Sequence, residues 1–379
     1  METLTLGRIS FKNYKNLDDD QVQLQRLNLL IGPNGSGKSN LVSLLRFFKQ
    51  ALTGLPSEAG RVSQLEGAIL RLGGSYILDA SMDPPARVNL SYSLVTPEKG
   101  KAYQYKYDLL VQGPGKEVLP KEESWDEFTG INQNNVQTQF SSPSTRTPPA
   151  GVYIDSLSSW QFYNANQMSL EVIRVSEPKL GPSDRFLSAS GDNLPLVFDN
   201  LSQEYLEFEE TITESMREIL PWTKKVRAVR SGRLGLVIEW SFQPPGGKTE
   251  RFYLTEMSDG SVRMLSWAIA LLSPEPAALL VIEEPEIGVH IAWMPALAKW
   301  IKQAANRTQL IVSTHSPDLL DQFTDMIPNL LVFQESSKRK NRFAIQRLQP
   351  ERLSDRVEQG WQLGDLYRVG DPEVGGWPW

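Results

Sequence analysis

The sequence predicts an α/β fold with a mostly parallel central sheet, and two regions indicate it. Residues 27–31 form a short apolar stretch typical of a buried strand, and leucines at helical spacing follow over residues 40–50. After residue 255, apolar strands alternate regularly with amphipathic helices. Because strands that alternate with helices form parallel sheets with covered faces, we expect these two regions to build one sheet.

The individual elements follow from local periodicity. Residues 4–12 and 21–31 are predicted strands, and the first helix should run to about residue 52. Strict alternation over residues 87–94 and 103–109 predicts antiparallel strands. The polar stretch 114–150, rich in Pro, Gln, Asn and Ser, is expected to be a surface loop.

The second half of the chain carries the regular alternation. A helical segment is expected over residues 200–220, where Pro221 ends it. Strands are predicted near 234–242 and 251–254 before the alternating region begins. From there the predicted order is helix 260–272, strand 278–283, helix 290–305, strand 308–313, helix 316–324 and strand 329–333. The parallel sheet is therefore assembled from both ends of the chain.

Composition excludes several classes of protein. The 379 residues include no cysteine and only two histidines, which excludes disulfides, thiolate metal sites and a poly-histidine centre. No apolar run reaches the ~18 residues that cross a bilayer, and the first residues lack a secretory signal, so a cytoplasmic location without a membrane partner is expected. The net charge of −6 argues against a general polycation. Two basic clusters, residues 224–233 and 338–342, are either solvated turns or phosphate contacts on nucleic acid.

A phosphate-binding loop lies between the first buried strand and the first helix. Residues 32–39 fit the pattern G-x-x-x-x-G-K-[ST]. Its glycines allow a tight turn whose N–H groups point inward at an anion, and the helix N-terminus adds its dipole. Lys38 should reach the β- and γ-phosphates, and the Ser39 hydroxyl should bind Mg²⁺. The expected nucleotide-binding residues are Gly32, Pro33, Asn34, Gly35, Ser36, Gly37, Lys38, Ser39 and Asn40.

Two carboxylates end the apolar strand at 279–284. Successive side chains at a strand end face opposite ways, so Glu283 and Glu284 can take different roles. Glu283 is expected to hold Mg²⁺ directly or through water, and Glu284 to polarise the water that attacks the γ-phosphate. His315, just beyond the next strand, can hydrogen-bond the γ-phosphate. The alternative is that these are solvated strand-end residues.

A third segment, residues 256–263, begins a helix, with Ser258 as its N-cap and Gly260 allowing close backbone approach. The order of these motifs resembles the ABC-type ATPase head of the SMC/RecF/OLD group, and in particular its short stand-alone ATPases. The resemblance covers residues 1–50 and 250–335. It implies that Ser258 and Gly260 belong to a signature motif that completes the ATP site of a second copy, packed head to tail. The segment 11–14 is similar to the family's N-terminal strand, whose end lies near the nucleotide.

The resemblance also has departures. The family usually has aspartate where Glu283 stands, although the longer side chain can still reach the water shell of the metal. A glutamine that contacts the metal could be Gln64, or Gln64 could be an ordinary surface residue. We assign residues 1–55 and 250–379 to the ATPase head, and residues 56–249 to an inserted α+β lobe that contains the antiparallel strands.

The sequence therefore predicts a P-loop ATPase that binds ATP and Mg²⁺, dimerises around ATP and separates after hydrolysis. The resemblance implies a role in DNA repair or in defence against foreign DNA. The acidic clusters of a fused nuclease are not found, so a separate effector such as a nuclease is the expected partner, with DNA as a further one. Two other readings stay open: an ATP-binding sensor or scaffold with negligible turnover, and the nucleotide-binding subunit of a transporter.

Overall fold

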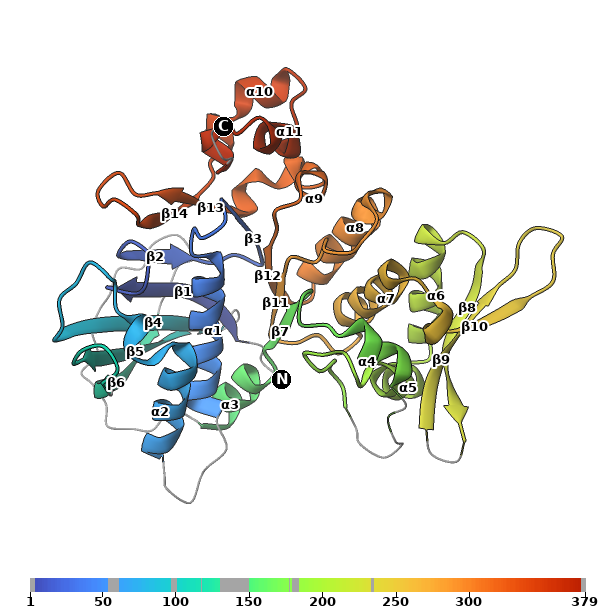
Figure 1. Cartoon of the computed structure of the whole chain (residues 1–379), viewed down its shortest axis with the longest axis horizontal. Helices are drawn as coiled ribbons and strands as arrows, with labels where there is room; N and C mark the ends of the chain where they lie inside the picture. Colours follow the sequence, from blue (N-terminus) through green and yellow to red (C-terminus); the bar gives the residue numbers. More distant parts are fainter. Residues whose placement is uncertain are drawn as a thin grey trace. The chain divides into compact units, whose positions relative to one another are not determined.

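The computed structural model describes residues 4–53, 61–96, 101–116, 118–129, 150–176, 178, 184–232 and 235–375. By their contacts these residues form two compact units (Figure 1). Unit 1 consists of Met1–Trp160 together with Met326–Trp379, and unit 2 is Gln161–Asp325. Each unit contains parallel strands and an antiparallel sheet.

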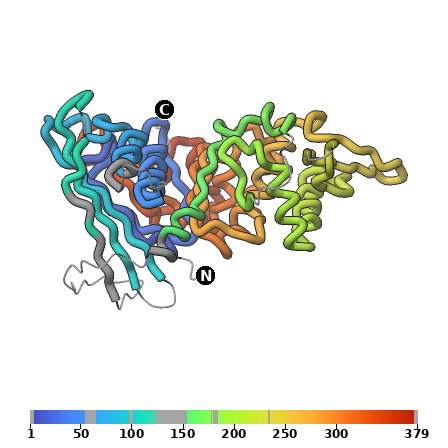
Figure 2. The backbone as a smooth tube through the Cα atoms, turned by 90° about the horizontal axis from the view of Figure 1, so that it is seen from below, coloured from blue at the N-terminus to red at the C-terminus, as the bar shows by residue number. Residues whose placement is uncertain are grey.

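An antiparallel sheet of five strands forms much of unit 1. Its order is β2-β1-β4-β5-β6, and the long strands lie side by side in the tube view (Figure 2). The predicted alternation is confirmed in register, because Tyr92 pairs with Tyr105 and Leu90 with Tyr107 on one buried face. The strands are β1 (Thr5–Lys12), β2 (Asp20–Gln23), β4 (Ala86–Thr96), β5 (Lys101–Val111) and β6 (Val118–Thr129).

Helix α1 (Lys38–Thr53) covers the buried face of this sheet. The rings of Phe47 and Phe48 contact Tyr107, and Phe48 also lies 4.4 Å from Tyr92 between ring centroids. Aromatic pairs at these separations stabilise a core beyond their buried area. The helix that follows the phosphate loop is thus anchored by its apolar face. Other helices of unit 1 are α2 (Arg61–Leu72), η1 (Gly74–Ile77), α3 (Ala150–Ser158), η5 (Pro350–Arg352), α10 (Ser354–Glu358), α11 (Leu363–Arg368) and η6 (Pro372–Val374).

Unit 1 also contributes parallel strands. Strand β13 (Leu330–Glu335) pairs in parallel with β3 (Leu27–Ile31) and antiparallel with β14 (Phe343–Arg347). All five residues of β3 are buried, as the apolar run predicted. The single strand predicted over 21–31 is wrong, because β2 and β3 belong to different sheets. The chain turns between them where the Asn28 side chain bonds both the N–H and the carbonyl oxygen of Gln25.

The polar stretch 114–150 contains a strand. Residues 118–129 form β6, which pairs with β5 along its whole length, so the predicted surface loop is wrong there. Without β6, the edge of β5 would leave backbone N–H and carbonyl groups without hydrogen-bond partners. The need to pair these groups outweighs the polar composition of residues 118–129. Residues 130–149 lie outside the described part of the chain.

Unit 2 is built on the parallel strands β12 (Gln309–Ser313), β11 (Leu279–Glu283) and β7 (Gln161–Asn164), paired in that order. The central α7 (Asp259–Leu272) is buried nearly all round. A second, antiparallel sheet contains β8 (Thr223–Ser231), β9 (Gly235–Phe242) and β10 (Glu250–Tyr253). The remaining helices that lie wholly in this unit are α4 (Leu170–Val175), α5 (Leu194–Glu204), α6 (Phe208–Ile219), η2 (Leu254–Glu256), η3 (Ile291–Trp293), α8 (Met294–Ala305) and α9 (Pro317–Asp321); η4 (Thr324–Asn329) spans the boundary between the units.

The helix predicted over 200–220 is in fact two helices. Helix α5 ends at Glu204 and α6 begins at Phe208. Tyr205 leaves the helical conformation with φ −122° and ψ 97°, and its hydroxyl donates to the Glu275 carboxylate at 2.9 Å. This tertiary hydrogen bond lies at the break, where sequence periodicity alone shows only continuous helix.

Candidate functional site

The phosphate loop has the backbone geometry that its glycines predicted. It follows β3 directly, and α1 begins at Lys38. Gly32 has φ +144° and Gly37 has φ +97°, which are conformations that L-residues rarely adopt. A side chain would also collide, because a Cβ at Gly32 would lie 2.7 Å from the Phe333 carbonyl oxygen and one at Gly37 would meet Leu17. Both positions therefore require glycine, because of their positive φ and because a side chain would collide with neighbouring atoms.

Lys38 turns its ammonium group onto the loop itself. Its Nζ donates to the carbonyl oxygens of Gly32 at 2.8 Å and Pro33 at 2.9 Å, and Ser36 Oγ lies 3.4 Å away. The side chain is buried, with 7% exposure, so its charge is concentrated at the loop. Ser39 follows in the first turn of α1 and is exposed. The cation and the hydroxyl predicted for phosphate and Mg²⁺ thus occupy adjacent positions at the helix start.

The segment after β1 supports the loop from the side. Asn16 Nδ2 donates to the Gly35 carbonyl oxygen at 2.6 Å, and Asn16 Oδ1 accepts from Asn40 Nδ2 at 2.7 Å. The Tyr14 hydroxyl donates to the Asn40 carbonyl oxygen at 3.0 Å. The sequence placed residues 11–14 near the loop, and Tyr14 is there. Asn16 was missed, because a single asparagine in a loop carries no recognisable spacing.

In unit 2, polar side chains gather at the carboxyl ends of β7, β11 and β12. Glu283 ends β11 and is buried, whereas Glu284 has φ +52°. A positive φ in a non-glycine residue marks a backbone held by its surroundings. Glu284 N–H donates to the Ser313 carbonyl oxygen at 2.9 Å, which ties the turn to β12. The two carboxylates therefore stand in different environments, Glu283 buried at the end of the strand and Glu284 partly exposed just beyond it.

The Glu284 side chain lies between two potential hydrogen-bond partners. Asn166 Nδ2 donates to one carboxylate oxygen at 3.3 Å, and His315 Nε2 lies 3.8 Å from the other. Both Glu284 and His315 are partly exposed, at 31% and 28% of their side-chain surface. The structure thus brings together two residues that the sequence analysis selected separately. It adds Asn166, which follows β7, a strand too short to be recognised in the sequence.

Glu286 orients His315 through the backbone. Its Oε1 accepts hydrogen bonds from Thr314 Oγ1 and from the His315 N–H, both at 2.8 Å. Burial raises the pKa of the Glu286 carboxyl, and the same two hydrogen bonds oppose that rise. Its other oxygen, Oε2, is buried and has no hydrogen-bond partner among the described residues. No sequence pattern assigns a role to Glu286.

The start of α7 lies at the surface of unit 2. Ser258 caps the helix, with its Oγ accepting from the Ser261 N–H at 3.3 Å. A Cβ on Gly260 would lie 3.0 Å from the Trp293 ring and 3.3 Å from the Gly288 carbonyl oxygen, so the backbone is closely packed there. Arg174 pairs with the exposed Asp259 at 2.5 Å and donates to the Met257 carbonyl oxygen at 2.7 Å. Arg174 is a residue that the sequence analysis missed.

For a metal, the donor set would be hydroxyl and carboxylate oxygens. Ser39 in unit 1 and Glu283 in unit 2 each carry an oxygen of the hard type that Mg²⁺ prefers. Within the described part of the chain, no group of three or more His, Cys, Asp or Glu residues is placed to hold a metal by itself. Gln64 falls in α2, but its side chain lies outside the described residues.

Ion pairs inside the protein account for part of both basic clusters. In the turn after β13, Arg339 pairs with Asp19 at 3.1 Å, and Arg342 pairs with the fully buried Asp79. In β8, Arg227 donates twice to a Glu239 carboxylate oxygen, at 2.8 and 3.0 Å. These arginines hold strands and loops together. The expectation of a solvated turn is therefore wrong for Arg227, which lies in a strand, and for Arg342, whose side chain is 8% exposed, whereas Arg339 is 39% exposed in its turn.

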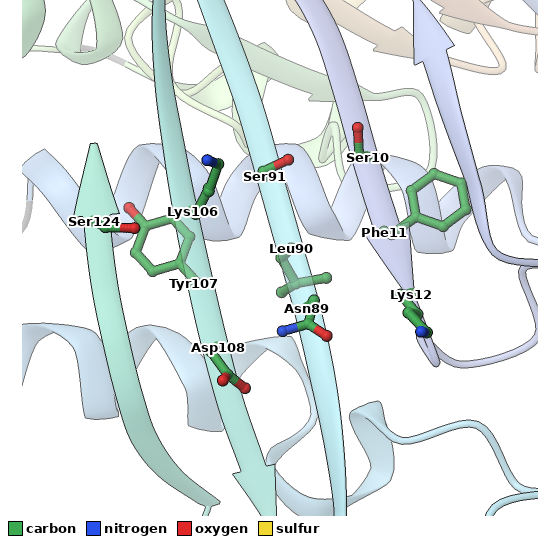
Figure 3. Close-up of a pocket in the computed structure, with 10 residues that line it drawn as sticks. All are labelled: Ser10, Phe11, Lys12, Asn89, Leu90, Ser91, Lys106, Tyr107, Asp108 and Ser124. Atoms are coloured by element: carbon green, nitrogen blue, oxygen red, sulfur yellow. The ribbon is translucent and has the colours of Figure 1, made fainter. Parts of the chain in front are cut away.

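A hollow of about 270 Å³ lies on the antiparallel sheet of unit 1 (Figure 3). Its polar lining comes from β1, β4, β5 and β6 and includes Lys12, Asn89, Lys106 and Asp108. The ring of Tyr107 contacts Phe47 and Phe48 of α1. Because side chains alternate along a strand, its neighbours Lys106 and Asp108 face the other side of the sheet. None of the residues predicted for the nucleotide site lines this hollow.

The strand, glycine-rich loop and helix around Lys38, together with the parallel strands, define a P-loop ATPase. Solved structures agree on the fold. An Smc head bound to the C-winged helix domain of ScpA matches with a TM-score of 0.58 at 16% identity, over 92% of this chain and 99% of that one. Smc head domains from Pyrococcus furiosus (TM-score 0.56, 14% identity) and Pyrococcus yayanosii (0.51, 12%) each match over 94% of this chain and 99% of theirs.

The chain belongs to the family described as "AAA domain, putative AbiEii toxin, Type IV TA system", whose model matches residues 27–321. Among curated proteins, no sequence matches. The predicted recognition as an ABC-type ATPase of the SMC kind and the predicted fold class are both confirmed. Within the described residues, every helix is too short or too polar to cross a bilayer.

Proposed function

We propose that this chain binds ATP with Mg²⁺ and hydrolyses it to ADP and phosphate. The observation that carries the proposal is the polar cluster around Glu284, a strand-end carboxylate 3.3 Å from Asn166 and 3.8 Å from His315, in a chain that also has a phosphate loop. Glu284 takes a proton from the attacking water, the water oxygen bonds to the γ-phosphorus, and the bond from that phosphorus to the bridging oxygen breaks. Ser39 and Glu283 are the residues that would hold Mg²⁺, which when bound would supply positive charge at the phosphates.

The remaining residues stabilise the charge that develops. Lys38 already donates to loop carbonyl oxygens and can exchange them for phosphate oxygens, which are stronger acceptors. His315 is oriented by the Glu286 carboxylate through its backbone N–H. In this arrangement His315 either hydrogen-bonds the γ-phosphate or steadies Glu284. Fixed donors and charges of this kind lower the barrier without reorganising during the reaction.

We further propose that ATP joins two copies head to tail. Ser258 and Gly260 of one copy would complete the site of the other, and the exposed position of Ser258 supports this. Hydrolysis would then separate the copies. The division into a head, residues 1–55 and 250–379, and an inserted lobe, residues 56–249, is part of this proposal, with the lobe transmitting the change. The output would be DNA repair or defence against foreign DNA together with a separate effector, which rests on family analogy.

The test of hydrolysis is ATP turnover by Glu284→Gln. We expect turnover to fall by at least about 100-fold while ATP binding is retained, because a general base contributes about 10²–10⁴ in rate. Glu335→Gln is the matched control, since Glu335 also ends a parallel strand but is exposed. If wild type and Glu284→Gln hydrolyse ATP equally slowly, the chain is an ATP-binding sensor or scaffold instead.

Dimerisation and DNA binding have separate tests. Analytical ultracentrifugation of Glu284→Gln with ATP should show a dimer, and the added substitution Ser258→Arg should return it to a monomer. A monomer in ATP before that second change would contradict the head-to-tail proposal. For DNA, binding to duplex and single strands should be strongest at low salt, where phosphate contacts dominate. Undetectable binding under those conditions would exclude DNA handling by this chain alone.

A further inference from the structure

The turn at the end of the described chain lies directly against the phosphate loop. Helix η6 (Pro372–Val374) ends at Gly375, which has φ +67°. A Cβ built on Gly375 would lie 3.2 Å from Gly32 Cα, 3.6 Å from Gly32 N and 2.9 Å from Val332 Cγ1. Val374 beside it is fully buried. An added carbon atom at Gly375 would therefore collide with Val332 and press closely on the first glycine of the loop.

Strand β13 also confines Gly32. A Cβ on Gly32 would lie 2.7 Å from the Phe333 carbonyl oxygen, so β13 presses on the loop from that direction. The Gly32 carbonyl oxygen accepts from Lys38 Nζ at 2.8 Å and, at a longer 3.5 Å, from the Tyr367 hydroxyl. The C-terminal segment therefore contacts the peptide group that holds the phosphate-binding lysine.

The turn is held in place by its own contacts. Gln334 Nε2 of β13 donates to the Pro372 carbonyl oxygen at 2.5 Å. Arg356 pairs with the Asp371 carboxylate at 2.6 Å, and the Asp371 N–H donates to the Leu366 carbonyl oxygen at 3.0 Å. Asp371 is itself buried. A segment fixed at several points can transmit its position to the loop that it touches.

We propose that the turn 371–375 is a positioning element of the nucleotide site, which fills the space behind Gly32 and so sets the geometry of the phosphate loop. The inference rests on the proposed binding of ATP. Gly375 and Gln334 act as positioning residues, because they contact the loop or the turn and not the nucleotide. It follows that ATP affinity depends on how residues 350–375 are docked, and that a ligand or partner displacing them would weaken ATP binding.

The experiment compares two glycines of the same C-terminal segment. Gly375→Ala adds a carbon atom against Gly32, whereas Gly360→Ala adds it at φ +89° with no heavy atom within 4 Å. Both glycines have a positive φ, +67° at Gly375 and +89° at Gly360, so both substitutions introduce left-handed backbone strain. In titrations of a fluorescent ATP analogue, Gly375→Ala should raise the Kd at least about 10-fold, and Gly360→Ala should leave it within about twofold of wild type, since only one of them displaces the loop.

Gln334→Ala loosens the turn without adding atoms, which keeps the inference testable if Gly375→Ala fails to fold. Its matched control is Gln346→Ala, an exposed glutamine of β14. We expect Gln334→Ala to raise the KM for ATP about threefold or more with kcat within about twofold, the pattern of lost binding rather than lost chemistry. A merely structural role would lower the melting temperature and leave KM unchanged.

The possible outcomes separate the two proposals. If wild type binds ATP and both Gly375→Ala and Gln334→Ala bind it as their controls do, the positioning inference is wrong and the proposed function stands. If wild type does not bind ATP, the proposed function is wrong and this inference falls with it. If Gly375→Ala or Gln334→Ala weakens ATP binding while Gly360→Ala and Gln346→Ala do not, the inference is supported.

Discussion

Replacing Arg342 by alanine should destabilise unit 1 by about 3 kcal/mol, because it leaves a buried carboxylate without its ion-pair partner. Asp79 is fully buried and the Arg342 side chain is 8% exposed. Removing one partner of a buried pair costs about 3–5 kcal/mol. Asp79 also accepts hydrogen bonds from the Ser81 N–H at 2.7 Å and Oγ at 2.6 Å, and Arg339 lies 3.7 Å away. These remaining contacts place the cost at the lower end of that range.

Urea unfolding followed by circular dichroism measures this loss. Lys340→Ala is the control, because Lys340 is exposed in the same turn and should change the free energy of unfolding by no more than about 0.5 kcal/mol. A double-mutant cycle with Asp79→Asn should give a coupling energy of at least about 1 kcal/mol. The reasoning is refuted if Arg342→Ala costs no more than Lys340→Ala, or if the two changes at the ion pair are additive.

Two further predictions concern the acid beside His315 and the phosphate loop. Burial raises the pKa of the Glu286 carboxyl in the folded state, so the folded protein binds its proton more tightly than the unfolded chain does. The stability that this proton contributes is fully present below the unfolded pKa of about 4.3 and is lost as pH rises through the folded pKa. As pH rises from about 4 to 8, the free energy of unfolding of Glu286→Gln, measured by urea titration, should therefore increase relative to that of wild type. If the difference between the two free energies stays the same over this range, the reasoning is contradicted. Gly37→Ala, which collides with Leu17, should cost at least about 1 kcal/mol more than Gly35→Ala, which meets nothing within 4 Å. Equal melting temperatures for these two variants would show that the loop has more room than the structure gives it.

Short-range patterns were enough for the elements that carry the chemistry. The predicted first helix and the apolar strands before the phosphate loop and before Glu283 appear as α1, β3 and β11. Their signals, which are apolar runs, helical spacing and glycines, depend on neighbouring residues only. The wrong predictions include β6 and the break at Tyr205, which depend on a strand partner and on a hydrogen bond to Glu275. They also include the single strand over 21–31, which the structure divides between two sheets.

The same distinction holds for the candidate site. Glu283, Glu284 and His315 were found because each ends a recognisable strand. Asn166 and Glu286 were missed, since their roles exist only where β7, β11 and β12 end together. Sequence spacing could not show that Asn166 donates to Glu284, because 118 residues separate them.

By itself, the sequence determined that the chain has a phosphate loop, two strand-end carboxylates and an α/β architecture, because these are properties of short segments. Only the tertiary structure showed which residues far apart in the sequence contact each other. Arg339 in the basic turn pairs with Asp19, 320 residues away, and Tyr367 reaches Gly32 across 335 residues. Such pairs form only when the fold closes the intervening chain, so the packing decides whether a basic turn is a structural clamp and what lies behind the phosphate loop.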